Sequence, residues 1–237
     1  MKDKKKTIII LIIIAVIVIA TQIILNIFTP NNKVLISTYV KTLTPDDINI
    51  NIPCDKQILK ENQIPYFRVS NTLYDSINKD ILENSLLRVC YQNGYMSYDI
   101  SLNDNILSLI VYISYETENE LANIEYKTYN INTDTNQIVT NQELLNKYNL
   151  TINQVNTKVL AELNKYYNYE IENDLVDQNI TFSDYLNILE YKTVTLDNLS
   201  LFIDKKNDLY IYKDFSLSEG MKRLDYFPNL SNTFKLN

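Results

Sequence analysis

Residues Tyr95–Glu116, YMSYDISLNDNILSLIVYISYE, decide the fold of this chain. From Met96 to Leu102 every second residue is apolar, and the residues between them are polar. The chain then reaches Asn103-Asp104-Asn105, whose side chains favour turns, and continues from Ile106 as a more apolar run. This pattern predicts an antiparallel hairpin with one buried face.

Further strands are predicted on the C-terminal side of this hairpin. Ile124–Asn132 is typical of a third strand, and Thr133–Gln137 is typical of a tight turn in which Asn136 adopts a left-handed conformation. These segments extend the hairpin into a meander. Val194–Ile203 and Asp208–Phe215, joined by the polar turn DKKND, predict a separate C-terminal hairpin.

Helices are predicted where apolar residues recur every three or four positions after a capping residue. The first runs from Leu73 to about Arg88 behind Ser70-Asn71-Thr72. Capping boxes at Thr140–Glu143 and Thr151–Gln154 start two more helices. A brief helix is expected at Thr181–Leu189.

Two short strands, Val34–Val40 and Ile48–Ile52, are predicted before the first helix because they are rich in β-branched residues. The order of elements predicts an α+β fold. Its antiparallel sheet combines the meander with the C-terminal hairpin, and its helices pack on one face.

An uncharged stretch near the N-terminus predicts the location of the protein. Thr7–Phe28 is long enough to cross a bilayer as a helix, and Met1–Lys6, MKDKKK, places four lysines before it. We expect a single-pass signal anchor at 7–28 after a cytoplasmic tail at 1–6. A linker at 29–33 and an extracellular domain at 34–237 follow, the latter either undivided or split into sub-lobes 34–122 and 123–237. The alternative is a secretory signal cleaved after Val18-Ile19-Ala20, but the apolar run continues to Phe28.

Composition excludes several classes of site and partner. The chain has no histidine, which removes Ser-His-Asp and Cys-His catalysis and the usual zinc sites, so we expect no cofactor and no metal. It has 22 basic and 29 acidic residues, a balance that disfavours nucleic acid as a partner. The many Ile, Asn, Lys and Tyr residues are typical of an AT-rich genome, and the 19 tyrosines are either half-buried strand residues or sugar-stacking platforms.

Two alternatives are open for the only cysteines, Cys54 and Cys90. In an exported domain they can pair in a disulfide that closes a loop of about 35 residues. They can also remain as two buried thiols.

Catalytic arrangements are weakly indicated. Ser76-Ile77-Asn78-Lys79 matches the Ser-x-x-Lys of serine-lysine hydrolases, but the nearest candidate for their Lys-Thr-Gly strand is Lys192-Thr193-Val194. Carboxylates gather in two places, which could serve acid-base chemistry or hold calcium: Glu116, Glu118 and Glu120, and Glu170, Glu172, Asp174 and Asp177. No calcium-binding loop pattern is present, so solvated acidic loops are favoured and an enzyme is not expected.

The order of several short motifs carries a family resemblance. They are Tyr129–Asn132, Thr135–Gln137, Val139-Thr140, Glu143–Leu145 and Leu209–Tyr212. Over roughly residues 34–222 the chain resembles the extracellular domain shared by RsiV-type anti-sigma factors and PdaC-type peptidoglycan deacetylases. It departs from that family at residues 118–122, ENELA in place of a Gly-Ala-His loop, and at Asn136, which replaces a turn glycine.

The resemblance implies a binding or sensing module without the sigma-binding or catalytic parts. Its expected ligand is a cell-wall glycan, such as peptidoglycan, or a cationic lysozyme-like protein. The alternatives are a structural subunit of an envelope complex and, less favoured, a hydrolase. The candidate ligand-binding residues are Glu116, Glu118, Glu120, Tyr210, Tyr212 and Phe215.

Overall fold

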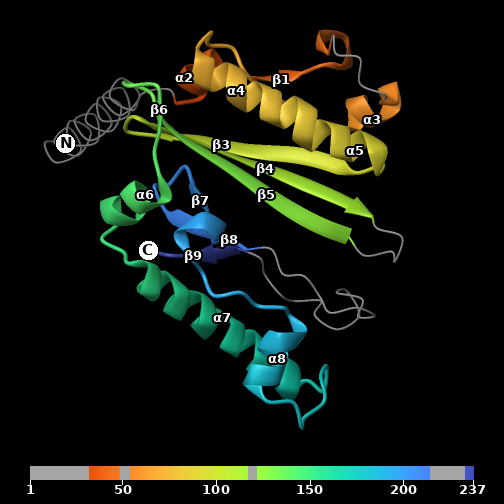
Figure 1. Cartoon of the computed structure of the whole chain (residues 1–237), viewed down its shortest axis with the longest axis vertical. Helices are drawn as coiled ribbons and strands as arrows, with labels where there is room; N and C mark the ends of the chain where they lie inside the picture. The colour runs from red at the N-terminus through yellow and green to blue at the C-terminus, as the bar shows by residue number, and fades with distance from the viewer. Residues whose placement is uncertain (1–31, 49–53, 117–121, 214–232) are drawn as a thin grey trace, which may run out of the picture.

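A four-stranded antiparallel meander forms the centre of the molecule. The computed structural model describes residues 32–48, 54–116, 122–213 and 233–237. One long helix lies across one face of the meander (Figure 1). A three-stranded sheet and then helix α7 lie on the other side. The fold is therefore α+β with antiparallel sheets, as predicted.

The meander follows the sequence pattern closely. Its strands are β3 (Tyr95–Asn103), β4 (Ile106–Glu116), β5 (Ala122–Asn132) and the short β6 (Gln137–Ile138). The β3–β4 register runs from Tyr95 opposite Ser114 to Asn103 opposite Ile106. Asn136 adopts a left-handed conformation with φ 52° in the turn before β6. The predicted hairpin, third strand and turn are confirmed.

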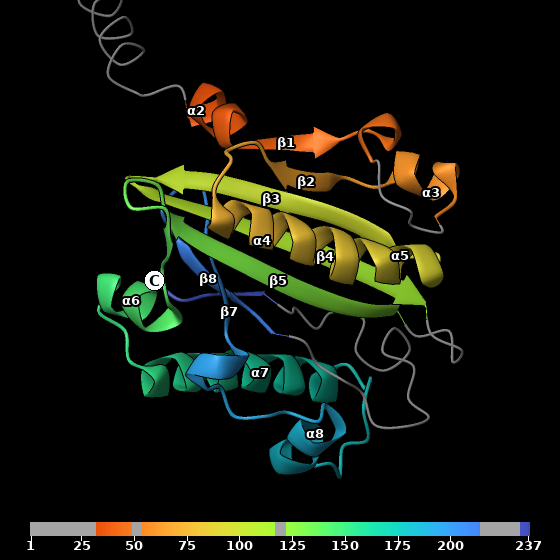
Figure 2. The ribbon, with the colours of Figure 1, turned by 45° about the horizontal axis from the view of Figure 1, so that its top comes forward.

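The helix on the first face is continuous from α4 (Thr72–Asp80) through the π-helical stretch η2 (Ile81–Leu86) into α5 (Leu87–Tyr91). Asn71 caps it by accepting a hydrogen bond from the Leu73 N–H at 2.8 Å. Its apolar side packs on the meander and forms the first core with β3–β5 (Figure 2). The predicted helix at Leu73–Arg88 is confirmed.

The predicted strand at Val34–Val40 is wrong. Residues Asn32–Tyr39 form helix α2, and only Val40–Leu43 is extended, as β1. Ile36 and Tyr39, three positions apart, share one side of the helix and both pack against the first core, so packing outweighs their β-propensity. The 3-10 turn η1 (Pro45–Asp47), helix α3 (Lys56–Glu61) and strand β2 (Ile64–Phe67), the partner of β1, follow. Of the predicted strand Ile48–Ile52, residues 49–52 lie outside the described residues.

The C-terminal part builds a second core. Both capping boxes are confirmed: Thr140 caps α6 (Asn141–Lys147), and Thr151 caps α7 (Ile152–Glu172). The brief helix is α8 (Phe182–Ile188), and the second hairpin pairs β7 (Ser200–Ile203) with β8 (Leu209–Tyr212). Its first strand is shorter than predicted, because the 3-10 turn η3 (Leu196–Asn198) precedes it. Strand β9 (Thr233–Lys235), which the sequence pattern does not predict, pairs with β8.

The prediction of one sheet with helices on one face needs correction. The strands that the structure describes form three sheets, and the second face of the meander is covered by the β7–β8–β9 sheet. The second core draws on residues from Val139 to Leu236 and on Ile106 of β4. The first core draws mainly on residues before Asn132, and the division into sub-lobes at 122 and 123 stays a prediction.

Three buried polar side chains, here called the polar seam, join the meander to the β7–β8–β9 sheet: Ser101, Ser108 and Asn130. Among the described strands, β7 pairs only with β8, so the groups on its other edge need partners. Side chains of the meander supply them: the Ile203 N–H donates to Ser108 Oγ (3.0 Å), and Asn130 Nδ2 donates to the Leu201 carbonyl (2.9 Å). The Ser101 hydroxyl donates to the Ile203 carbonyl. The polar side of β3 is thus buried at Ser101 instead of facing water.

Replacing Asn130 by alanine is expected to lower the free energy of unfolding by about 2 kcal/mol. The substitution leaves the buried Leu201 carbonyl without its side-chain donor and removes the acceptor of the Ser108 hydroxyl. Urea denaturation of Asn130→Ala beside Thr128→Ala, a change two residues away on the same strand, measures the difference. Equal stability of the two variants would contradict a structural role for the seam.

No helix among the residues described here has the length and apolar character needed to cross a membrane. The predicted anchor at Thr7–Phe28 lies outside them.

Candidate binding site

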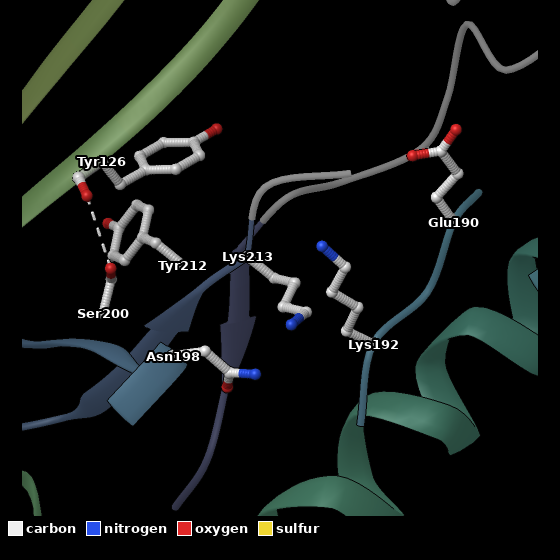
Figure 3. Close-up of a pocket in the computed structure, with 7 residues that line it drawn as sticks. All are labelled: Tyr126, Glu190, Lys192, Asn198, Ser200, Tyr212 and Lys213. Carbon is white, nitrogen blue, oxygen red and sulfur yellow. Dashed lines mark hydrogen bonds between the residues drawn. The ribbon is translucent and has the colours of Figure 1, made fainter. Parts of the chain in front are cut away.

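A cavity of about 240 Å³ lies where the C-terminal sheet meets β5 (Figure 3). Its walls come from four places in the chain: β5, the segment after α8, the start of β7, and the end of β8. The lining residues are Tyr126, Glu190, Lys192, Asn198, Ser200, Tyr212 and Lys213.

Tyrosine rings form one wall of the cavity. Tyr112 and Tyr126 stand opposite each other on β4 and β5, and the β7–β8 hairpin brings Tyr212 against both. The ring centroids of Tyr126 and Tyr212 are 5.3 Å apart. The Tyr112 hydroxyl lies 3.2 Å from both Tyr212 Oη and Asp99 Oδ2. Burial raises the pKa of Tyr112 and of Tyr212, so both phenols stay protonated near neutral pH.

Two lysines also line the cavity, and the Lys213 side chain extends away from the ring of the preceding Tyr212 (Figure 3). Lys213 directly follows β8 and is buried, with its Nζ 5.6 Å from the centroid of the Tyr191 ring. Tyr191 is held in turn by Asn156 of α7, whose Oδ1 accepts a hydrogen bond from the Tyr191 hydroxyl at 2.6 Å. Lys192 is exposed at the rim.

Local backbone structure places the remaining groups. Helix α8 ends with Glu190 in a left-handed conformation, φ 47°, and the Tyr191 N–H donates to the Leu186 carbonyl (2.9 Å) in a Schellman motif. Asn198 Nδ2 donates to the Thr193 carbonyl at 3.0 Å and closes the next turn. The Ser200 hydroxyl donates to the Tyr126 carbonyl at 3.4 Å, the dashed line in Figure 3.

The cavity therefore offers aromatic faces together with hydroxyl, amide and ammonium donors. No protein-family model matches this chain, and no curated protein matches it. What the site does must be argued from its own geometry.

The predicted ligand-binding residues are scattered with respect to this cavity. Tyr212 lines it, whereas Tyr210, two residues earlier on β8, is half-buried and does not. Glu116 is the last residue of β4, and the placement of its side chain lies outside what the structure describes. Glu118, Glu120 and Phe215 also lie outside the described residues.

The cysteines form the first of their two predicted alternatives. Cys54, just before α3, is bonded to Cys90 of α5, with Cα atoms 5.0 Å apart. The bond ties the N-terminal segment to the end of the long helix, on the opposite side of the meander from the cavity.

The positions of Ser76 and Lys79 do not favour serine-lysine catalysis. Ser76 and Lys79 are both exposed on α4, and Lys79 Nζ lies 3.8 Å from the carboxylate of Glu83. Serine-lysine catalysis needs a desolvated lysine instead. Lys79 and Glu83 also line a second cavity, of about 230 Å³, beside α4.

The second carboxylate group does not converge on one point. Glu170 is buried, whereas Glu172, Asp174 and Asp177 are exposed. Asp177 Oδ1 accepts a hydrogen bond from the Asn179 N–H at 2.9 Å, which is a local turn contact. Within the described parts of the chain, no group of three or more His, Cys, Asp or Glu residues is arranged to hold a metal ion.

Sequence reasoning missed most of the cavity. Strand alternation predicts that Tyr126 and Lys213 are half-buried or buried, but not that they line a site. Lys192 is singled out only by its comparison with the Lys-Thr-Gly strand of hydrolases, which it does not match. These residues lie up to 87 positions apart and meet because β7 docks on the meander. The one available signal was the pairing of aromatic residues on β4, β5 and β8.

Proposed function

We propose that this protein is a membrane-anchored, extracytoplasmic binding module that recognises a cell-wall glycan. The observation that carries the proposal is the cavity in which the rings of Tyr126 and Tyr212 stand beside ammonium, amide and hydroxyl groups.

This combination suits a sugar. An aromatic face packs against the C–H side of a pyranose ring, while the sugar hydroxyls need donors and acceptors around the edge. The Tyr212 phenol is neutral near pH 7, since burial raises its pKa, so its hydroxyl can donate and accept. Asn198 and Ser200 add short polar groups at the rim.

Three further observations support an envelope location. Thr7–Phe28 has the length and composition of a signal anchor, with lysines before it. The Cys54–Cys90 disulfide is typical of exported proteins. The motif order that resembles the RsiV- and PdaC-type extracellular domain is associated with recognition of the cell wall or of lysozyme-like proteins.

Binding of the full-length protein, in detergent micelles, to purified peptidoglycan sacculi tests the proposal by co-sedimentation. Tyr212→Ala is expected to weaken binding about tenfold, because it removes one aromatic face of the cavity. Tyr212→Phe keeps the ring and is expected to bind nearly as well as the unaltered protein. Tyr210→Ala is the matched control, since Tyr210 lies on the same side of β8 outside the cavity.

Several outcomes contradict this proposal. Equal loss in Tyr210→Ala and Tyr212→Ala would place the glycan elsewhere. Absence of binding to sacculi, with salt-sensitive binding to a cationic lysozyme, would favour recognition of a protein by this acidic chain, whose formal net charge is −7. Absence of both would favour a structural subunit of an envelope complex.

A further inference from the structure

Among the described residues that line the cavity, positive charge exceeds negative charge. Two of them are lysines and one is a glutamate, against a formal net charge of −7 for the whole chain. Lys192 forms neither an ion pair nor a hydrogen bond with any of the residues described. A lysine held at the rim of a cavity in an acidic protein raises the local concentration of anions.

Lys213 brings a second ammonium group into the cavity wall. Its side chain is 7% exposed, and its Nζ packs over the Tyr191 ring. A buried ammonium group is stabilised by negative charge close to it. An ammonium has three N–H donors, so an anionic oxygen of a ligand can add to the contacts that Lys213 already makes.

Glu190 forms no ion pair with either lysine. It lies on the same segment as Lys192, and its carboxylate points away from the Lys192 ammonium group (Figure 3). A neutral glycan would use the tyrosine wall but would offer no charged group to Lys192.

We propose that the cavity selects saccharides that carry an anionic group, a carboxylate or a phosphate. The sugar ring lies against Tyr126 and Tyr212, and the anionic group lies at Lys192 and Lys213. This selectivity rests on the glycan-binding function proposed above and specifies the class of glycan.

Calorimetric titration of the full-length protein with two matched probes tests the selectivity. One probe is a peptide-free tetrasaccharide of alternating N-acetylglucosamine and N-acetylmuramic acid, and the other is the same tetrasaccharide with its carboxylates methyl-esterified. The charged probe is expected to bind at least fivefold more tightly at low salt, and the difference is expected to shrink as salt screens the lysines. N-acetylglucosamine 6-phosphate against N-acetylglucosamine repeats the comparison for phosphate.

Variants assign the effect to the cavity. Lys192→Ala is expected to lower affinity for the charged tetrasaccharide at least threefold and to leave affinity for the ester unchanged. Lys205→Ala, in the exposed turn between β7 and β8, is the matched control and is expected to change neither. Lys192 is exposed, so its replacement is not expected to disturb folding, whereas Lys213 is buried and is left unaltered.

The outcomes separate the two proposals. Equal binding of the charged and neutral members of both probe pairs overturns the selectivity for anions and leaves glycan binding standing. A charge preference that Lys192→Ala and Lys205→Ala reduce equally also overturns it, because the charge effect is then not located at the cavity. Absence of binding to every probe and to sacculi overturns the proposed function itself. A preference in only one probe pair identifies which anion is recognised.

Discussion

Removing the Cys54–Cys90 disulfide is expected to lower the free energy of unfolding by about 3 to 4 kcal/mol. The bond closes a loop with a sequence separation of 36 residues, and a loop of that size restricts the unfolded chain by about that amount. For a protein of this length the melting temperature should fall by roughly 10 °C. Urea denaturation of the oxidised protein and of a Cys54→Ser/Cys90→Ser double variant measures the difference.

The reduced protein provides the control for this effect. A thiol reductant should destabilise the unaltered protein and leave the double variant unchanged. An unfolding midpoint that does not respond to reduction would mean that the N-terminal segment is held by its packing alone, chiefly through Leu59 and Ile64 in the first core.

The second large effect is expected at Glu170. This residue of α7 is fully buried against α8, and burial raises the pKa of its carboxyl to about 7, while the neighbouring Tyr185 hydroxyl opposes part of that shift. In the unfolded chain the same carboxyl titrates near its ordinary pKa of 4.5. At a pH between 4.5 and about 7, Glu170 is protonated in the folded protein and ionised in the unfolded chain.

The sign of the pH dependence follows from this proton. A state that binds more protons is favoured at lower pH, so the contribution of Glu170 to stability is greatest below about pH 4.5. It declines as the pH rises through about 7 and is constant above that. The total loss is about 3 kcal/mol, from a pKa difference of about 2.5 units at 1.36 kcal/mol per unit.

Glu170→Gln is expected to remove this decline. The variant should exceed the unaltered protein in stability by about 3 kcal/mol at pH 8 and differ little from it at pH 4.5, because the amide resembles the protonated acid. Glu172→Gln, an exposed position on the same helix, is the matched control. Parallel pH profiles for the unaltered protein and Glu170→Gln, measured by chemical denaturation, would show that Glu170 does not titrate in this range.

Much of the local structure follows from the sequence, because local rules decide it. Strand alternation locates β3, β4 and β5, and the capping boxes locate the starts of α6 and α7. Helix α2 does not follow from local rules, because residues with high β-propensity become helical where one side of the helix meets the core. Strand β9 is three residues long and is defined only by its pairing with β8.

The second face of the meander shows why the sheet arrangement was mispredicted. Ser101, Ser108 and Asn130 have the polarity of solvent-facing positions, yet they are buried. Their side chains form hydrogen bonds with backbone groups on the edge of β7 that does not face β8. The same use of asparagine recurs at Asn78, which exchanges two hydrogen bonds with the backbone of Phe67. A polar residue that satisfies backbone groups in the core cannot be distinguished by type from one that faces water.

The candidate site was predicted only through Tyr212. Its other members are ordinary residues that become a site when distant segments meet, and the cavity depends on the docking of β7 and β8 rather than on any local motif. Composition offered no help, because an abundance of tyrosine and lysine had a sufficient explanation in codon usage.

The seam between the two sheets also bears on how the protein avoids aggregation. A strand with one unpaired edge is a template on which another chain can add a strand. Here the outer edge of β7 is occupied by Ser108 and Asn130, which satisfy its backbone groups but cannot extend a ladder. The same contacts that dock the C-terminal sheet therefore end its growth, and this protection is in place once the meander has formed and the hairpin has met it.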